Sequence, residues 1–462
     1  MASPNIRMIV TSAQRLLRVG ATSHLANLLK KQRPADIAAI FRKLGDANAR
    51  VAFDSLVPVS TRLAMDAFAE LEPGFAAGLL AGRSATETAR LLRELAPDDM
   101  AALIEHLPPD MSSAVRDAMG QTGHGHDLLE YAEGTAGRIM TPNVFALGET
   151  VTAAEAVATL QRSEGPEVVF YLYVIDDRHH LVGVTSLRRL VLVPPDMPLA
   201  RIMTSDVVSV PVDAKQEDVA TLVASYNLLA IPVVDSENKL VGVITVDDVI
   251  DVIRDETTKD IQRLGGLEAL DEPYTRTPFW TLVQKRGRWL VVLFLGEMLT
   301  ATAMSHFEGE ISRAVVLALF VPLIISSGGN SGSQAASLMI RALAVGEVTL
   351  GDWWAVMRKE LRSGLALGSV LGFVGFLRVT LWANVGHMYG PHWFLIALTV
   401  AFSLVGVVMW GTLSGAMLPF VLKRLGADPA TSSAPFVATL VDVTGLIIYF
   451  SVAALLLTGT LL

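Results

Sequence analysis

The 462-residue sequence contains no cysteine. This absence excludes disulfide bonds and thiolate metal sites, so oxygen ligands and hard cations are the natural inorganic partners. No apolar run long enough to cross a bilayer occurs before residue 285, and no apolar signal segment precedes the polar first half, so we expect the first spanning segment to direct insertion. The sequence therefore predicts a water-soluble first half followed by a membrane-embedded second half.

Enzyme signatures are also absent. The sequence has no phosphate-binding loop, because the GGNSG run that begins at Gly328 lacks the lysine and the flanking strand of such a loop. It offers no nucleophile motif and no metal-ligating histidine cluster. We therefore expect a protein that is not an enzyme.

Five apolar segments have about the 20 residues that a membrane-spanning helix needs. They are 289–305, 314–339, 364–385, 393–422 and 435–462. Lysine and arginine cluster before the first segment, between the second and third, and after the fourth, whereas the alternate loops hold only Arg313. By the positive-inside rule we expect the N-terminal half in the cytosol and the C-terminus outside the cell.

The last apolar segment, from Pro435 to Leu462, carries one formal charge, Asp442. A charged aspartate near the middle of a bilayer costs about 2.5–3.5 kcal/mol on insertion scales, so such residues usually face a bundle interior or an ion path. A cation pathway is the first hypothesis, and a protonated or hydrogen-bonded carboxyl group that pairs two helices is the alternative. For Glu297 in the first segment the interpretations are a place in the ion path, a role in proton coupling, or a carboxylate that pairs two helices near the inner half of the membrane.

Two kinds of domain are predicted in the soluble half. Residues 10–130 repeat short helical phrases that begin with proline and an acid, which predicts an all-α superhelical domain, and residues 120–126, with two histidines, form the predicted linker. Next, the run Arg138-Ile139-Met140-Thr141 recurs as Arg201-Ile202-Met203-Thr204. Each copy continues as strand, turn, strand and helix, with turns at 176–177 and 235–238 and strands at 181–184 and 240–244.

These two copies, 137–199 and 200–254, resemble a tandem CBS module, an α/β fold whose clefts often bind adenosine nucleotides. The resemblance makes ATP a candidate ligand, with Tyr171 to stack the base, and with Arg188 and Thr245 as further contacts. Arg189 stands where a ribose-binding aspartate is common after the helix start, which argues against a site in the first copy. A module that senses only ions or mediates dimerisation is the alternative.

Acidic residues gather in the predicted linking helix, 248–275, and just before it. They are Asp247, Asp248, Asp251, Asp255, Glu256 and Asp260. At helical spacing Asp248, Asp251 and Asp255 share one face, and like charges three and four residues apart destabilise a helix. Bound Mg²⁺ would offset this repulsion, and a solvated acidic face balanced by nearby lysine and arginine is the alternative.

The second apolar segment contains PLIISSGGNSGSQAASLMIRAL, from Pro322 to Leu343. Close helix packing explains its glycines and serines, but not Asn330 and Gln334 one turn apart in a membrane span. With this run and with ATLVDVTGLIIYFSVA around Asp442, the sequence resembles the MgtE family of magnesium channels and transporters over essentially its whole length.

The resemblance implies a homodimer in the lipid bilayer of the cell membrane, with a five-span pore domain at 276–462 and no nucleic-acid partner. Mg²⁺ would be the substrate, and other divalent cations are open. The ion path would be lined by the second and fifth spans, with Asp442 as the principal ion site and Asp428 at the cytosolic mouth. Its other lining residues would be Asn330, Ser333, Ser337 and Gly445.

The resemblance further implies closure by cytosolic Mg²⁺ bound between the N-terminal domain, the CBS module and the linking helix. The implied regulatory ligands are Asp98, Asp99, Glu217, Asp247, Asp248, Asp251, Asp255, Glu256 and Asp260. Asn227 and Lys259 stand where acids are frequent in the family, so we expect weaker sensing. Uptake through a channel down the electrochemical gradient is the first hypothesis, and a secondary transporter that exchanges Mg²⁺ or another divalent cation such as Co²⁺ is the alternative.

Overall fold

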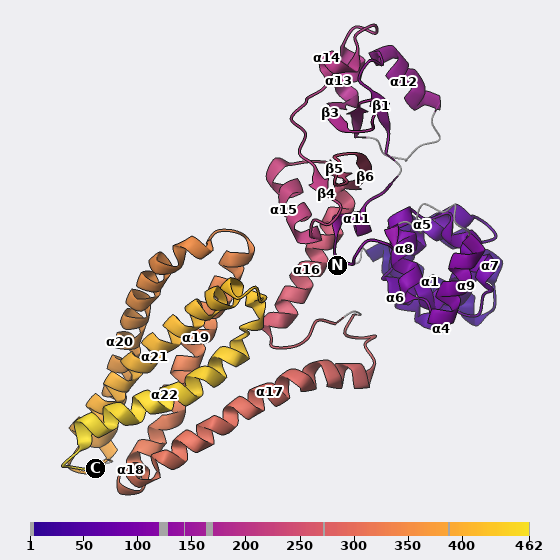
Figure 1. Ribbon diagram of the computed structural model, residues 1–462. Helices are drawn as coiled ribbons and strands as arrows, with labels where there is room; N and C mark the ends of the chain where they lie inside the picture. Colours follow the sequence, from indigo (N-terminus) through magenta and orange to yellow (C-terminus); the bar gives the residue numbers. More distant parts are fainter. Residues whose placement is uncertain are drawn as a thin grey trace. The chain divides into compact units, whose positions relative to one another are not determined.

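The computed structural model describes residues 4–119, 128–142, 144–162, 170–270, 273–386 and 389–461. The chain divides into two compact units, Met1–Asp255 and Glu256–Leu462. An all-α domain and an α/β module make up the first unit, and long apolar helices make up the second (Figure 1). The predicted multi-domain fold class is therefore confirmed, whereas the linker at 120–126 and its two histidines lie outside the described residues.

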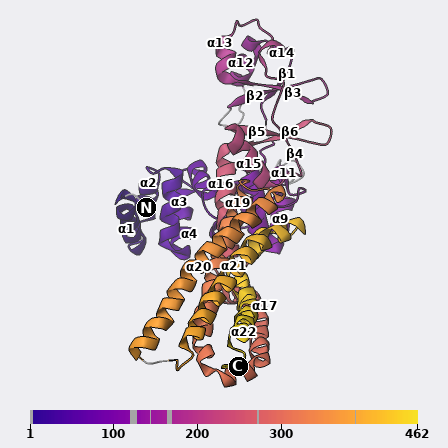
Figure 2. The same ribbon diagram turned by 90° about the vertical axis from the view of Figure 1, so that its left-hand side faces the viewer.

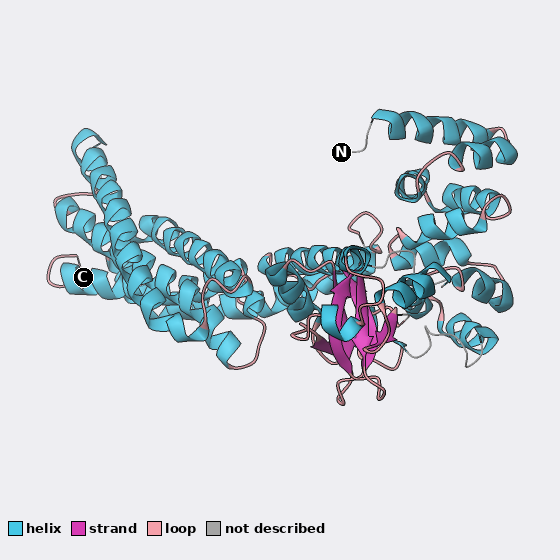
Figure 3. Cartoon of the chain, turned by 90° about the horizontal axis from the view of Figure 1, so that it is seen from above, coloured by secondary structure: helices cyan, strands magenta, loops and turns pink. Residues whose placement is uncertain are grey.

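Short helices stack in succession in the N-terminal domain (Figure 3). They are α1 (Pro4–Arg18), α2 (Thr22–Leu29), α3 (Pro34–Leu44), α4 (Asp46–Leu56), α5 (Thr61–Ala69), α6 (Pro73–Leu80), α7 (Ala85–Leu92), α8 (Pro97–His106) and α9 (Pro109–Met119). A proline begins α3, α6 and α8, because the first helical position needs no backbone N–H donor. The buried rings of Phe41, Phe53 and Phe68 contact one another in the core.

The α/β module contains two three-stranded sheets, in the orders β1-β2-β3 and β4-β5-β6. The first copy comprises α11 (Ala136–Ile139), β1 (Ala146–Gly148), α12 (Ala153–Arg162), β2 (Tyr171–Ile175), β3 (Leu181–Ser186) and α13 (Leu187–Leu192). The second comprises α14 (Leu199–Ile202), β4 (Val210–Pro211), α15 (Gln216–Tyr226), β5 (Ala230–Val234), β6 (Leu240–Thr245) and α16 (Val246–Leu264). Both predicted turns form, because Asp176 and Asp235 accept backbone N–H groups from the residues two and four positions later.

The repeated Arg-Ile-Met-Thr runs are exchanged between the two copies. Thr141 of the first run pairs with Val243 in the second sheet, and Thr204 of the second run pairs with Val184 in the first sheet. The methionine of each run lies over a glycine of the opposite copy, so that a Cβ atom at Gly242 would lie 2.5 Å from Met140 Sδ. The two copies therefore fold as one interlocked pair.

The second unit contains five helices that are long and apolar enough to cross a membrane, as the sequence predicts. Its elements are α17 (Phe279–His306), α18 (Glu308–Arg313), η1 (Val315–Phe320), α19 (Val321–Ala344), η2 (Leu350–Asp352), α20 (Trp353–Gly386), α21 (Trp393–Arg424), η3 (Pro429–Thr431) and α22 (Ala434–Leu457). Helix α21 packs against α19, α20 and α22, while α17 lies along α22 (Figures 1 and 2).

Glycine pairs let α19 and α21 cross at backbone contact. A Cβ atom at Gly411 would lie 2.3 Å from the carbonyl oxygen of Gly328, and one at Gly415 would lie 2.1 Å from that of Gly332. Both helices thus use two glycines four residues apart, a spacing that brings membrane helices close together. This crossing explains Gly328 and Gly332 of the SGGNSGSQAAS run, and Ser331, whose hydroxyl hydrogen-bonds to that of Thr412 on α21 at 2.7 Å, but it does not explain Asn330.

The linking helix is shorter than predicted. It begins at Val246 and ends at Leu264, so the prediction of a helix over 248–275 is wrong at its C-terminal end. Gly265 and Gly266 follow, and Gly266 adopts a φ of +70°, which L side chains rarely tolerate. A side chain at residue 266 would also collide with the indole of Trp289. Glycine is therefore the residue that fits where the chain leaves the helix.

Candidate functional site

A cavity of about 400 Å³ lies between α17, α19 and α22 in the second unit. Its polar lining residues are Glu297, Thr300, Ser326, Asn330, Ser333 and Asp442. No lysine, arginine or histidine occurs among the described residues that line it. The cavity therefore has two carboxyl groups, hydroxyl and amide oxygens, and no basic side chain, which is the donor set of a hard cation.

Helix α19 presents four polar side chains along one face, toward this cavity and beyond it. Ser326, Asn330, Ser333 and Ser337 follow each other at steps of four, three and four residues, which places them on one side of the helix. The glycines that contact α21 lie on another side. Ser333 Oγ donates to the carbonyl of Ala434 at 3.1 Å, which ties this polar face to the start of α22.

Three of the predicted lining and ion-site residues lie outside the cavity wall. Ser337 is exposed one turn beyond Ser333 and donates to its carbonyl oxygen at 2.9 Å. Gly445 is buried, and a Cβ atom there would lie 3.1 Å from Ile325 and 3.2 Å from Val407, so this glycine packs between helices. Asp428 accepts a hydrogen bond from Arg263 Nη1 at 2.6 Å and from the Ala430 N–H, so it already has a basic partner.

Glu297 lines the cavity but is not among the ion-site residues predicted from the sequence. The structure places it on the wall of the same cavity as Asp442. A single carboxylate in a membrane span can be recognised from the sequence. The register between two spans cannot, because the sequence does not determine which faces of the two helices meet.

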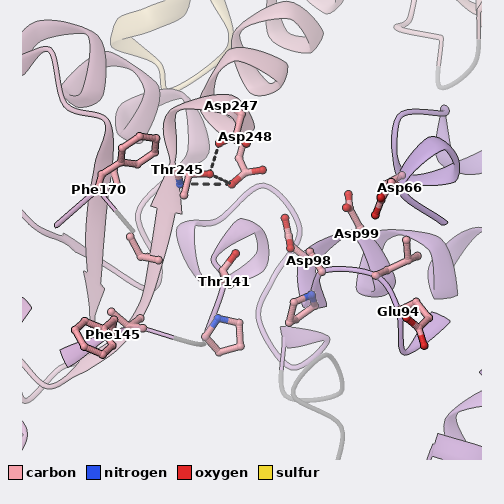
Figure 4. A pocket seen from close by; sticks show the side chains of 18 of the residues that line it. Asp66, Glu94, Asp98, Asp99, Thr141, Phe145, Phe170, Thr245, Asp247 and Asp248 are labelled. Atoms are coloured by element: carbon pink, nitrogen blue, oxygen red, sulfur yellow. Dashed lines mark hydrogen bonds between the residues drawn. The ribbon is translucent and has the colours of Figure 1, made fainter. Parts of the chain in front are cut away.

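A second cavity, of about 960 Å³, lies in the first unit between the N-terminal domain and the α/β module. Its acids are Asp66, Glu94, Asp98, Asp99, Asp247 and Asp248 (Figure 4). The first turn of α8 supplies Asp98 and Asp99, and the first turn of α16 supplies the last two. The start of the linking helix and the N-terminal domain therefore present acids to one shared space.

Burial and mutual repulsion change the acidity of these carboxyl groups. Burial, and then the charge of Asp98, raise the pKa of Asp99 to about 8. Burial also raises the pKa of Asp248 to about 7, with Asp98 as its strongest charged neighbour, and it raises the pKa of Asp98. Asp98 Oδ1 is buried without a hydrogen-bond donor among the described residues. These carboxyl groups thus hold their protons at a higher pH than exposed aspartates do.

The nucleotide candidates are only partly brought together. Tyr171 and Thr245 line the second cavity, and Thr245 Oγ1 donates to Asp248 at 2.8 Å. Arg188 is exposed on α13 and does not line it. At the equivalent place in the first copy, Ser186 Oγ accepts the Arg189 N–H, so that cleft has no carboxylate at this position.

The remaining predicted regulatory acids lie elsewhere. Glu217 is exposed at the start of α15, and Asp251 forms an exposed ion pair with Arg254. Glu256 pairs with Lys259 at 2.6 Å, so here a lysine neutralises an acid of the linking helix. Asp255 and Asp260 also lie on α16, outside the residues that line the second cavity.

The described residues of one chain do not form a set of side chains that would ligate a metal ion directly. Among the described residues, no group of three or more His, Asp or Glu side chains is arranged to hold a metal ion. Mg²⁺ keeps several of its water ligands in most protein sites, so both cavities suit an ion held largely through its own water shell.

Known proteins resemble this chain along most of its length. The family models match as "MgtE intracellular N domain" at residues 32–134, "CBS domain" at 136–196 and 199–255, and "Divalent cation transporter" at 321–452. The sequence is 44% identical to the magnesium transporter MgtE of Thermus thermophilus over 331 residues, covering 71% of this chain and 72% of that protein. The chain belongs to the MgtE family.

Further MgtE proteins agree with this assignment. The magnesium transporter MgtE of Enterococcus faecalis is 35% identical over 72% of both chains. The crystal structure titled as the cytosolic domain of the Mg²⁺ channel MgtE in complex with ATP is similar at 33% identity and a TM-score of 0.50, covering 53% of this chain and 99% of that one. The chain is thus a membrane protein of a transporter family, and not an enzyme.

Proposed function

We propose that this chain transports Mg²⁺ across the cell membrane, as a homodimer whose ion path passes Asp442. The observation that carries the proposal is the cavity between α17, α19 and α22, where acids and neutral oxygens meet without a basic side chain among the described lining residues. An uncompensated carboxylate in a membrane span is costly, and a permeant cation offsets that cost. The names of the related MgtE proteins support Mg²⁺ as the cation.

The size of the cavity suits a hydrated ion. Six first-shell waters occupy about 180 Å³ at about 30 Å³ each, which is less than half of the cavity. Asp442 and Asn330 would then accept hydrogen bonds from the water ligands and need not replace them. Since Mg²⁺ loses water reluctantly, outer-shell recognition of this kind permits rapid passage, which favours a channel for uptake over a carrier.

Closure by cytosolic Mg²⁺ is the second part of the proposal. The cavity of the first unit collects acids from α8 and from the start of α16, and a divalent ion there stabilises the arrangement that gathers them. Because α16 runs on from this cavity to Leu264, which packs in the second unit, the same helix belongs to the sensor and to the pore unit. ATP is a candidate ligand of the same cavity beside Tyr171 and Thr245.

Flux of Mg²⁺ into proteoliposomes tests the transport function. We expect the wild-type chain to carry Mg²⁺, Asp442→Ala to carry none, and Asp442→Asn, which keeps the shape and one oxygen, to retain more activity than the alanine variant. Each variant must elute at the wild-type position in size-exclusion chromatography. Near-normal flux through a folded Asp442→Ala protein would contradict the proposal.

A further inference from the structure

Glu297 is the acidic residue whose position the proposed ion path does not by itself explain. It lies in the middle of α17, and its side chain is exposed in the single chain while also lining the cavity of Asp442. A helix-pairing role through an ion pair would need a basic side chain opposite the carboxylate. The described residues that line the cavity include no lysine, arginine or histidine, and α22 contributes a second acid, Asp442, to the same cavity.

The packing of α17 on α22 fixes this juxtaposition. Trp289 Nε1 of α17 donates to Ser433 Oγ at the start of α22 at 3.3 Å, and the ring of Phe307, just after α17, stacks on that of Phe450 in α22 at 4.8 Å. Between these contacts, a Cβ atom at Gly296 would lie 2.9 Å from the Thr439 side chain. The contacts advance together along both helices, so the helices run parallel in one register.

That register places Glu297 at the depth of Asp442. Gly296 allows α17 to approach α22 where Thr439 projects, and Asp442 follows Thr439 by about one helical turn. Two carboxylates at one depth repel each other strongly in a low dielectric, and a single positive charge does not neutralise both. A divalent cation does.

We infer that Glu297 and Asp442 act together as a two-carboxylate filter of one chain, which makes the path selective for divalent over monovalent cations. The inference rests on the proposed transport function and adds to it a specificity-determining residue. Asp442 alone would attract any cation. The second carboxylate adds attraction in proportion to the charge of the ion, so it favours Mg²⁺ over Na⁺ and K⁺.

The first test compares ion selectivity in reconstituted protein. We expect Glu297→Gln to lower Mg²⁺ flux at least tenfold and to raise the permeability ratio of Na⁺ to Mg²⁺, whereas Glu297→Asp keeps the ratio near the wild-type value. Glu308→Gln removes the same charge from α18, outside the cavity, and leaves both quantities unchanged. A folded Glu297→Gln protein with wild-type flux and ratio would overturn the inference.

The absence of cysteine permits a second test that does not depend on Glu297→Gln. Glu297→Cys gives a protein with one thiol, which can be modified with an anionic sulfonatoethyl or a cationic trimethylammonium methanethiosulfonate of similar size. We expect the anionic group to increase Mg²⁺ flux and the cationic group to abolish it. Equal effects of the two reagents would mean that only side-chain volume matters, and would overturn the inference.

The two proposals fail in different ways. A wild-type protein without Mg²⁺ flux contradicts the transport function itself. A wild-type protein that transports Mg²⁺ and stops on Asp442→Ala, but ignores the charge at residue 297, contradicts only the role of Glu297.

Discussion

At the scale of single residues, the cavity of the first unit gathers more carboxyl groups than basic ones: its described lining holds six acids, beside Arg62 and Arg93. Burial raises the pKa of Asp99 to about 8 and that of Asp248 to about 7, and both groups face other acids. By contrast, Asp176 bonds to His180 at 2.8 Å, and its pKa is lowered. The buried acids of the cavity in the first unit therefore hold protons at a higher pH than a free aspartate does, whereas the turn residue Asp176 stays ionised to a lower pH.

The raised pKa values of Asp99 and Asp248 make the stability of the first unit depend on pH. Their pKa values are near 3.9 in an unfolded chain, so between about pH 4 and pH 8 the folded protein binds protons that the unfolded protein has released. Without Mg²⁺, the free energy of unfolding of the first unit should fall as pH rises through this range and level off above about pH 8. Thermal unfolding of the full chain in detergent, followed by circular dichroism in EDTA, measures this.

Millimolar Mg²⁺ and a matched variant serve as controls for that experiment. Mg²⁺ should reduce the loss of stability at pH 8, because the ion replaces the released protons, and Asp99→Asn should flatten the pH profile because its amide does not titrate. A profile that is the same with EDTA, with Mg²⁺ and in Asp99→Asn would contradict the proposed ion site.

At the scale of the elements, one face of a helix packs against its neighbours while another face of the same helix lines the cavity. One face of α19 carries Gly328 and Gly332 against α21, and another carries Asn330 and Ser333 toward the cavity. In the same way, Gly445 of α22 faces its neighbours while Asp442 faces the cavity. Close packing and the lining of the polar cavity are thus both encoded within the SGGNSGSQAAS run of α19.

Replacing a glycine at the crossing should disturb the bundle. Gly415→Ala puts a Cβ atom 2.1 Å from the Gly332 carbonyl oxygen, and neither backbone can retreat without moving a helix. We expect destabilisation of about 1–3 kcal/mol, the usual cost of overpacking a core. A lower midpoint of thermal unfolding in detergent checks this.

Gly287→Ala is the matched control, because nothing lies within 4 Å of a Cβ atom built there on α17. Since alanine favours a helix over glycine, this variant should be as stable as the wild type or slightly more so. Equal midpoints for the two variants would contradict the crossing as described.

Local features of the site could be predicted from the sequence, whereas features that depend on how two elements pack together could not. Asp442, Asn330 and the two turns of the α/β module were predictable, because a lone charge, an amide in a span and an Asp-rich turn are local signals. The partner of Asp442 was not, because it depends on the register of α17 on α22. The interlocked methionines were not predictable either, since a repeat reveals two copies but not the exchange of their Arg-Ile-Met-Thr runs.

At the scale of the whole molecule, α16 is the element that the two units share. It starts with Asp247 and Asp248 in the first unit and ends in the second, where Arg263 pairs with Asp428 before α22. This ion pair is more than a third exposed, so by itself it stabilises the fold by about 0–1 kcal/mol. We propose that this pair, which ties the linking helix to the loop before α22, contributes more to gating than to stability.

Breaking this ion pair should change the response to Mg²⁺ more than the fold. We expect Arg263→Gln to shift the internal Mg²⁺ concentration that halves flux, because the linking helix loses one tie to the loop of Asp428. Arg254→Gln, which alters an exposed pair earlier on α16, is the matched control and should leave that concentration near wild type. Indistinguishable dose-response curves for wild type and both variants would contradict the gating role.

Single-channel recording from the reconstituted wild-type chain, with Mg²⁺ varied separately on each side of the bilayer, tests the central claim most directly. We expect discrete currents carried by Mg²⁺. We also expect the open probability to fall as the Mg²⁺ concentration rises on the side of the N-terminal half, because bound ions gather the acids of α8 and α16. Mg²⁺ flux without unitary currents would identify a carrier, and unitary currents insensitive to Mg²⁺ on that side would contradict closure by the acidic cavity of the first unit.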